Sequence, residues 1–513
     1  MVRSLLLVLA LHSGSASLPE MLERARQSLE ASDRPAARRE LTEALRRYPT
    51  SPAVRNFLGV LEAGEGNYEE AEKHFREAVR QAPDYTDAYL NLGRLYQENG
   101  AKDPKAGTRA LAAYQAILRY QPDHSEARFQ SAVLLQATGE FSRSLDELRR
   151  LPPADQERPA ALAVRLADHA GRGERAEADA TAGRLLAQGG FDELDVRSIL
   201  PVLAAQGRGD LAVRLLEDLR RRGRASSEDL QRLGLLREKD GQPVEARIRF
   251  EEAARDRPED VPLLLDLARV THKAGDGRGA LGYLAHARAL EPENARIPFL
   301  FGLICVELDL GAEAYNSLKD AVRLDPENAA ANYAMGAVAL HRKDPSEAIP
   351  YFRKYAELQP KEPRGPFAVG VAAFQAKDYE TARQLLVPAA ARPETAAAAN
   401  YYLARIARAE NEFEEGLRFA LRSVEVNPSY ADPWSELGLL YLRLEQPDKA
   451  EEALRRCLQI DPEHYLGNLH LMMLYARTRD PREPAQRQRF DEIKTRRTEK
   501  GEDFLRPIEV RPY

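Results

Sequence analysis

The chain has 513 residues, and its 75 Lys and Arg are offset by 81 Asp and Glu to give a net charge of −6. This balance leaves no overall basic surface and argues against a nucleic-acid-binding protein. The two cysteines and nine histidines are scattered, and no His-Glu-x-x-His pair occurs. We therefore expect no metal site and no cofactor.

The first 17 residues have the order of a secretory signal. Arg3 precedes an apolar run from Leu5 to Leu11, and small residues follow through Ser17. The run is too short to span a bilayer. We expect residues 1–17 to be a signal peptide that directs export to the periplasm or out of the cell. The alternative is a start that caps the first helices of a cytoplasmic protein.

From Ser227 onward the same helical pattern returns every 34 residues, and two copies over 18–85 fit the same spacing. In the copy from Ala431 to Pro462, two apolar stripes at helical spacing flank a polar break, and the proline ends the second helix. The eighth place of successive copies holds a small residue: Gly234, Ala268, Gly302, Gly336, Gly370, Ala404 and Gly438. Small residues there let two helices approach closely. The pattern predicts helix-turn-helix units that bury their apolar sides against one another.

The copy at 431–462 resembles the tetratricopeptide repeat (TPR) family. The residues that carry the resemblance are Trp434, Leu437-Gly438, Tyr441, Ala450 and Pro462, with Leu454 in place of the usual aromatic residue. The resemblance implies an all-α fold, an α-solenoid formed as a right-handed TPR superhelix of about 13 helix-turn-helix repeats with a C-terminal capping helix. It also implies a protein that binds other proteins.

The match to the repeat varies along the chain. We predict an N-terminal TPR array over 18–150, a diverged TPR-like helical segment over 151–226, a C-terminal TPR array over 227–464, and final helices with a cap over 465–500. A hinge and simple sequence drift both explain the middle segment. Residues 501–513 contain two prolines and are predicted to be an extended tail, draped over the solenoid or lying in its groove.

The resemblance places the concave surface on the first helix of each repeat. At its fifth place, four successive repeats carry an aromatic residue. We predict a concave, partly aromatic groove for a protein or peptide partner, formed by Phe299, Leu303, Tyr333, Leu340, Phe367, Val371, Phe374, Tyr401, Arg405 and Arg408. The alternative is that these aromatic residues mainly pack between adjacent first helices. The Lys and Asn of the family's carboxylate clamp are absent from these places.

These observations predict a non-catalytic scaffold or adaptor that mediates protein–protein interaction. We expect no catalytic residues, no transmembrane span, no nucleic-acid partner and no small-molecule substrate. Two alternatives stay open, namely an accessory subunit of an enzyme or envelope-assembly complex and a cytoplasmic TPR scaffold. An enzyme in its own right would need an unrecognised site within residues 151–226, because repeats occupy nearly all the rest.

Overall fold

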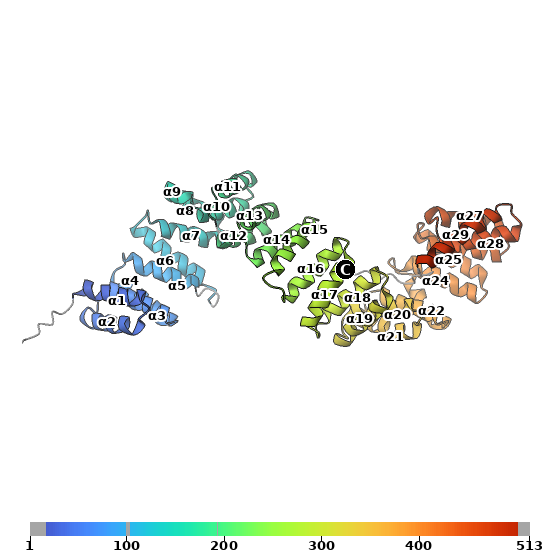
Figure 1. Cartoon of the computed structure of the whole chain (residues 1–513), viewed down its shortest axis with the longest axis horizontal. Helices are drawn as coiled ribbons and strands as arrows, with labels where there is room; N and C mark the ends of the chain where they lie inside the picture. The colour runs from blue at the N-terminus through green and yellow to red at the C-terminus, as the bar shows by residue number, and fades with distance from the viewer. Residues whose placement is uncertain (1–16, 99–102, 192, 501–513) are drawn as a thin grey trace, which may run out of the picture. The chain divides into compact units, whose positions relative to one another are not determined.

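The computed structural model describes residues 17–98, 103–191 and 193–500. These residues form 29 helices and no β-strand, which confirms the predicted all-α solenoid class (Figure 1). The predicted signal peptide lies outside the described residues except for Ser17, and the predicted tail at 501–513 lies wholly outside them. Of the helices described, none is long and apolar enough to cross a membrane. The chain divides into two compact units, Met1–Gly241 and Gln242–Tyr513.

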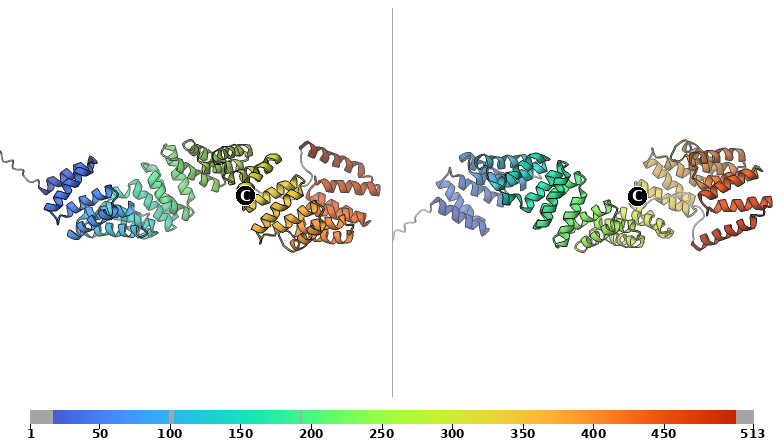
Figure 2. Two further views of the ribbon diagram at one scale, coloured as in Figure 1. Left: turned by 90° about the horizontal axis from the view of Figure 1, so that it is seen from below. Right: turned by 90° about the horizontal axis from the view of Figure 1, so that it is seen from above.

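The first unit is built from helices α1 to α14. Most consecutive helices form hairpins that stack side by side (Figures 1 and 2). The bounds are α1 Leu18–Glu30, α2 Arg34–Arg47, α3 Pro52–Gly64, α4 Tyr68–Gln81, α5 Thr86–Glu98, α6 Ala106–Tyr120, α7 Ser125–Ala137, α8 Phe141–Arg149, α9 Pro153–Gln156, α10 Pro159–Gly171, α11 Arg175–Gln188, α12 Glu193–Ala205, α13 Gly209–Arg221 and α14 Ser227–Lys239.

The middle segment, where the repeat pattern is weakest, is helical as well. The single turn α9 follows Pro152, and helices α10 to α13 come after it. Their apolar faces, with Leu233 of α14, form one core that includes Leu162, Leu185, Phe191 and Leu216. The segment therefore keeps the hairpin arrangement although its sequence departs from the repeat.

The second unit contains helices α15 to α29. From α16 onward, each first helix begins within one residue of the start that the 34-residue period predicts. The bounds are α15 Pro243–Ala254, α16 Val261–Lys273, α17 Gly277–Leu290, α18 Arg296–Glu307, α19 Gly311–Leu324, α20 Ala329–His341, α21 Pro345–Leu358, α22 Arg364–Gln375, α23 Tyr379–Ala389, α24 Ala396–Ala409, α25 Phe413–Val426, α26 Ala431–Arg443, α27 Pro447–Ile460, α28 Tyr465–Thr478 and α29 Glu483–Lys500.

Glycine at the eighth place of a repeat gives the second helix room to pack. The ring of Phe75 lies against Gly59, and the side chain of Leu454 lies against Gly438, so closely that a Cβ on either glycine would clash. Leu454 is fully buried in this position. An aliphatic side chain therefore fills the place that the family usually gives to an aromatic residue.

Successive repeats are joined by a hydrogen bond to a proline carbonyl. The side-chain amide of Asn332 donates to the carbonyl of Pro326 (2.9 Å), and that of Asn468 donates to Pro462 (3.2 Å). Trp434 holds the equivalent place, and its indole N–H donates to Pro428 (3.0 Å). Its ring packs on a core that its own repeat shares with the repeat before it, so Trp434 has a structural role.

Helix α29 covers the last hairpin and completes the second unit. Its two large apolar side chains, Phe490 and Ile493, are buried, and the Phe490 ring meets the ring of Tyr465 in α28 (5.0 Å between centroids). Most of the other side chains between residues 483 and 496 are polar or charged and exposed. This is the C-terminal cap expected for a solenoid, whose last repeat needs a polar outer face.

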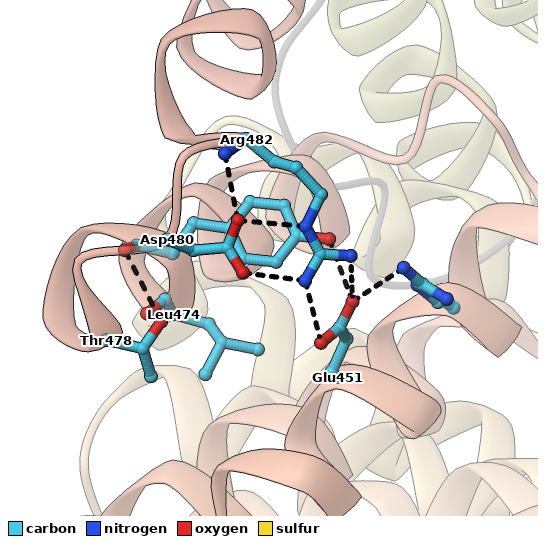
Figure 3. Close-up of polar contacts among 7 residues, drawn as sticks. Glu451, Leu474, Thr478, Asp480 and Arg482 are labelled. Carbon is cyan, nitrogen blue, oxygen red and sulfur yellow. Dashed lines mark hydrogen bonds and ion pairs between the residues drawn. The ribbon is translucent and has the colours of Figure 1, made fainter.

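A polar cluster fixes the turn that leads from α28 into α29 (Figure 3). The Arg482 guanidinium donates to both carboxylate oxygens of Glu451 in α27 (2.6 and 3.2 Å) and to Asp480 (2.7 and 2.9 Å). It also lies over the Tyr475 ring (4.4 Å), whose hydroxyl donates to Glu451 (3.0 Å). Hydrogen bonding from Arg482 holds the pKa of Glu451 below its usual value. The cluster thus ties the cap to the repeat before it.

Candidate protein-binding surface

The ten residues predicted to form a groove lie on four first helices of the second unit, α18, α20, α22 and α24. Four of them belong to the packed core, with exposed fractions of 2% for Leu303, 1% for Leu340, 0% for Val371 and 4% for Tyr401. Leu303 lies in a core cluster formed by α18, α19 and α20, and the other three lie in a cluster formed by α20 to α24. The other six are partly exposed, and we call them the first-helix surface: Phe299, Tyr333, Phe367, Phe374, Arg405 and Arg408.

Aromatic side chains on this surface also pack between repeats. Phe367 and Phe374 of α22 each meet the ring of Tyr402 in α24, with centroids 6.2 and 5.5 Å apart. Tyr333 instead contacts Phe352 and Tyr355 of the second helix α21, at 5.6 and 5.0 Å. The rings therefore contribute to packing, as the alternative interpretation expects, and still keep part of each ring exposed.

Arg405 sits at one end of this surface above several aromatic rings. Its guanidinium carbon lies 4.7 Å from the ring centre of Phe374, 5.4 Å from that of Tyr401 and 5.7 Å from that of Tyr402. Tyr430, from the loop before α26, packs on Tyr401 (5.6 Å). We call Phe374, Tyr401, Tyr402 and Tyr430 the Arg405 cage. Cation–π contacts of this kind hold the guanidinium in place.

The carboxylates nearest the Arg405 cage already have partners. Asp432 accepts a hydrogen bond from His464 (3.2 Å), and the nearly buried Glu436 pairs with Arg408. Arg405 itself forms no hydrogen bond or ion pair with any residue that the structure describes. Burial raises the pKa of Tyr402 to about 12 and that of Tyr401 well above its usual value. The phenols are therefore neutral at physiological pH, and Arg405 carries the positive charge of the cage.

Chemically reactive groups are sparse over the described part of the chain. No cluster of three or more His, Cys, Asp or Glu side chains that could hold a metal ion occurs there. Cys305 and Cys457 are buried free thiols, and burial raises the pKa of Cys305 to about 11. A thiol with so high a pKa is a poor nucleophile. The partly exposed aromatic and cationic side chains are suited to binding.

Sequence reasoning identified Arg405 but missed two members of its cage. Tyr402 occupies the sixth place of its repeat and Tyr430 lies in the preceding loop, and neither position is among those that line the concave surface in the family pattern. The sequence did contain a signal for Tyr402. Tyr401 and Tyr402 precede Arg405 by four and three residues, and residues at these spacings share a helix face.

Comparison with known protein families identifies the repeat. Models of the tetratricopeptide repeat match residues 22–86, 64–103 and 306–363, residues 105–167, and residues 431–464. The chain belongs to the tetratricopeptide repeat family. Repeats of this family stack into extended surfaces that bind other proteins, and the fold of this TPR protein supports a protein-interaction scaffold.

Similar proteins share the repeat over limited regions. Tetratricopeptide repeat protein 13 of Homo sapiens is 29% identical over 87 residues, which are 17% of this chain and 10% of that protein. The tetratricopeptide repeat domain-containing protein PYG7, chloroplastic, of Arabidopsis thaliana is 30% identical over 120 residues, 23% of this chain and 38% of the relative. The TPR chain thus matches well under half the length of either.

Solved structures with the same repeat are distant. A tetratricopeptide repeat protein from Parabacteroides merdae shares 16% identity with a TM-score of 0.42, over 48% of this chain and 98% of that one. Yeast Tom70 shares 15% identity with a TM-score of 0.37, over 89% of this chain and 97% of that one.

Proposed function

We propose that this TPR protein is a non-catalytic scaffold that holds a protein partner on its first-helix surface. The observation that carries the proposal is the line of partly exposed aromatic side chains, Phe299, Tyr333 and Phe367, at the same place of three successive repeats. Packing of the solenoid requires only the buried face of each first helix. Aromatic rings that stay partly exposed outside that face are suited to binding another protein. Aromatic and arginine side chains also dominate the binding energy of protein interfaces.

Paired substitutions on two faces of the second unit test this proposal. The groove pair, Phe299→Ala with Phe367→Ala, shortens two rings of the first-helix surface. The control pair, Val387→Ala with Leu421→Ala, shortens exposed side chains (54% and 43% exposed) of the second helices α23 and α25. Tagged wild-type and variant chains are purified from their native cells under gentle conditions, and the proteins that accompany them are quantified.

We expect one partner at fixed stoichiometry with the wild type and the control pair, and loss of that partner with the groove pair. Thermal unfolding followed by circular dichroism must show that the groove pair keeps its helical content. Retention of the partner by a folded groove pair would place the binding site elsewhere and overturn the proposal. A partner that is itself an enzyme would identify the protein as an accessory subunit.

We also propose that the scaffold works outside the cytoplasm. This part of the proposal rests on the sequence of residues 1–17, in which Arg3, the apolar run and the small residues before Leu18 have the order of an export signal. N-terminal sequencing of the protein from fractionated cells tests it. A mature chain that starts near residue 18 in the exported fraction supports export, and an intact Met1 in the cytoplasmic pool contradicts it.

A further inference from the structure

The Arg405 cage presents a cation whose hydrogen-bonding capacity is unused in the described part of the chain. A guanidinium is always charged and carries five N–H donors in a planar fork. The faces of Phe374, Tyr401 and Tyr402 hold it by cation–π contact, and those contacts leave the N–H groups at its edge without acceptors. A carboxylate is the acceptor that matches this fork, because it can accept two parallel bonds.

The surface next to the cage favours an extended ligand with apolar side chains. Phe367 and Phe374 lie on α22, one repeat from Arg405, and Tyr333 lies on α20, one repeat further. All three are partly exposed. An extended segment that crosses the first helices would bring apolar side chains to these rings and a carboxylate to Arg405. The ligand chemistry is therefore that of an acidic, apolar strand.

The chain contains such a segment immediately after α29. Residues 501–513 read GEDFLRPIEVRPY, with three carboxylates, Glu502, Asp503 and Glu509, placed among Phe504, Leu505, Ile508 and Val510. Two prolines disfavour a helix and favour an extended backbone. Two arginines, Arg506 and Arg511, leave the segment with a side-chain charge of −1. Its carboxylates complement the Arg405 cage, and its apolar residues complement the neighbouring rings.

The segment is also long enough to reach this surface. Thirteen extended residues span about 43 Å. Helix α29 packs on α28, in the same unit as α24. Neighbouring helices lie about 10 Å apart, so the four steps from α29 through α28, α26 and α24 to α22 cover about 40 Å, which is within this reach.

We propose that residues 502–513 bind to the first-helix surface of their own chain, with a carboxylate on Arg405 and apolar side chains on Phe367 and Phe374. The segment then occupies part of the surface to which the partner binds and competes with it. The competition rests on the proposed function, whereas docking of the segment does not.

Cross-linking in the full-length chain tests the docking. A photoreactive phenylalanine analogue replaces Tyr513, which lies far enough along the segment to reach α22, the protein is illuminated at low concentration, and cross-linked peptides are identified by mass spectrometry. The expected products are intramolecular links to α20, α22 or α24. Links to other helices, or links only between two copies of the chain, would overturn the proposal.

Charge variants show whether Arg405 is the anchor. Replacing Glu502, Asp503 and Glu509 by Gln, Asn and Gln removes the carboxylates without touching any described helix, so the fold is unaffected. Losing a charge-assisted bond lowers the docking equilibrium constant by about tenfold, and the cross-linked yield falls with the fraction of docked chains. Arg405→Gln should give the same loss, and Arg418→Gln, which removes an exposed charge from α25 of the same hairpin, should not. Equal yields from all variants would contradict the anchor.

The two proposals fail in different ways. Absence of the expected cross-links, with the partner still lost from the Phe299 and Phe367 pair, would reject the docked segment and keep the scaffold. Cross-links to α22 and α24, with the partner retained by that pair, would reject the binding surface and keep the docked segment. Deleting residues 502–513 raises partner affinity if both hold, and unchanged affinity would contradict the competition.

Discussion

The ring of Phe352 packs directly on Gly336, so that a Cβ added to the glycine would lie 2.8 Å from the ring carbons Cδ1 and Cε1. Phe352 is fully buried and has no free space to move into. In a helix, Gly→Ala normally stabilises by about 0.5–1 kcal/mol. Here we expect Gly336→Ala to destabilise the second unit by about 1–3 kcal/mol through overpacking, measured as a lower midpoint of urea unfolding.

The matched control is Gly282→Ala in α17 of the same unit. Nothing lies within 4 Å of a Cβ added at Gly282, so the usual helical gain should appear and the midpoint should rise. Two identical substitutions are thus expected to have opposite signs. A rise for Gly336→Ala would show that the eighth place of the repeat does not limit how closely its helices pack.

The turn between the two helices of a repeat requires a left-handed residue. Lys377 has φ of 64°, and its backbone N–H donates to the carbonyl of Phe374 (3.0 Å). A β-carbon is strained in this conformation, and glycine is not. We expect Lys377→Gly to stabilise the unit by about 0.5–1 kcal/mol, seen as a higher unfolding midpoint.

Asn411 is the control for this effect because it holds the equivalent place with φ of 63°. Asparagine tolerates the left-handed region better than lysine, so Asn411→Gly should gain less than Lys377→Gly. If both substitutions stabilise the unit equally, the stabilisation does not come from relief of backbone strain in the turn, and a change in the unfolded state would have to explain it.

Asp168 makes the first unit sensitive to pH. It is fully buried in α10, and neither carboxylate oxygen has a hydrogen-bond partner among the described residues, since the Ser144 hydroxyl donates to the Ala132 carbonyl (2.9 Å). Burial raises the pKa of Asp168 to about 8, and the nearby Ser144 hydroxyl and the positive charges of Arg165 and Arg172 lower it only in part. The carboxyl is therefore protonated in the folded protein at neutral pH.

The sign of the effect follows from this raised pKa. The unfolded carboxyl has its ordinary pKa near 3.8, so its contribution to stability is full below that pH and is lost as pH rises toward 8. Between these two pKa values the unfolded state binds one proton fewer than the folded state. The free energy of unfolding therefore falls by about 1.4 kcal/mol for each pH unit. Asp168→Asn should flatten the unfolding free energy of the first unit between pH 5 and 8, whereas the exposed Asp146→Asn should not. If the free energy of unfolding of Asp168→Asn depends on pH as steeply as that of the wild type, the carboxyl of Asp168 is not protonated in the folded protein.

The cluster around Arg482 should control how firmly α29 covers the last hairpin. Arg482→Ala removes the bonds to Glu451 and Asp480 and the stacking on Tyr475. We expect faster amide hydrogen exchange in α29 and little change in α18 to α24. Arg443→Ala, which removes an exposed arginine from α26, should leave exchange in α29 unchanged. Equal exchange in wild type and Arg482→Ala would mean that the Arg482 cluster does not control the cap, and that the remaining contacts of α29 are sufficient.

The sequence predicts the repeats well because their packing is local. A small residue at the eighth place and a large one in the second helix, as in Gly438 and Leu454, recur at a fixed spacing within one hairpin. The left-handed turns were harder to predict. Lys377 and Asn411 stand where an earlier repeat has Gly275, and all three residues have a positive φ. Glycine at this place indicates a left-handed turn, whereas lysine does not, so the turn at Lys377 cannot be predicted from its own residue type.

The candidate surface is predicted only in part, because burial depends on neighbouring repeats. The family pattern selects Phe367 and Val371 alike, yet the structure leaves Phe367 partly exposed and buries Val371. Val371 lies within a core cluster that spans α20 to α24, whereas Phe367 only packs against that cluster. No single repeat encodes this arrangement. The Arg405 cage likewise combines residues from α22, α24 and the loop before α26.

The hydrogen bond from Trp434 to the carbonyl of Pro428 has a consequence for how such chains change length. The joint between two repeats is encoded within one short stretch, because the donor lies only 6 residues after its acceptor. Gain or loss of a whole 34-residue copy recreates an equivalent joint at the new boundary. A chain of this kind can therefore lengthen or shorten in steps of one module, and a copy gained or lost between α24 and α29 would shift Arg405 relative to residues 501–513 without disturbing either hairpin at the junction.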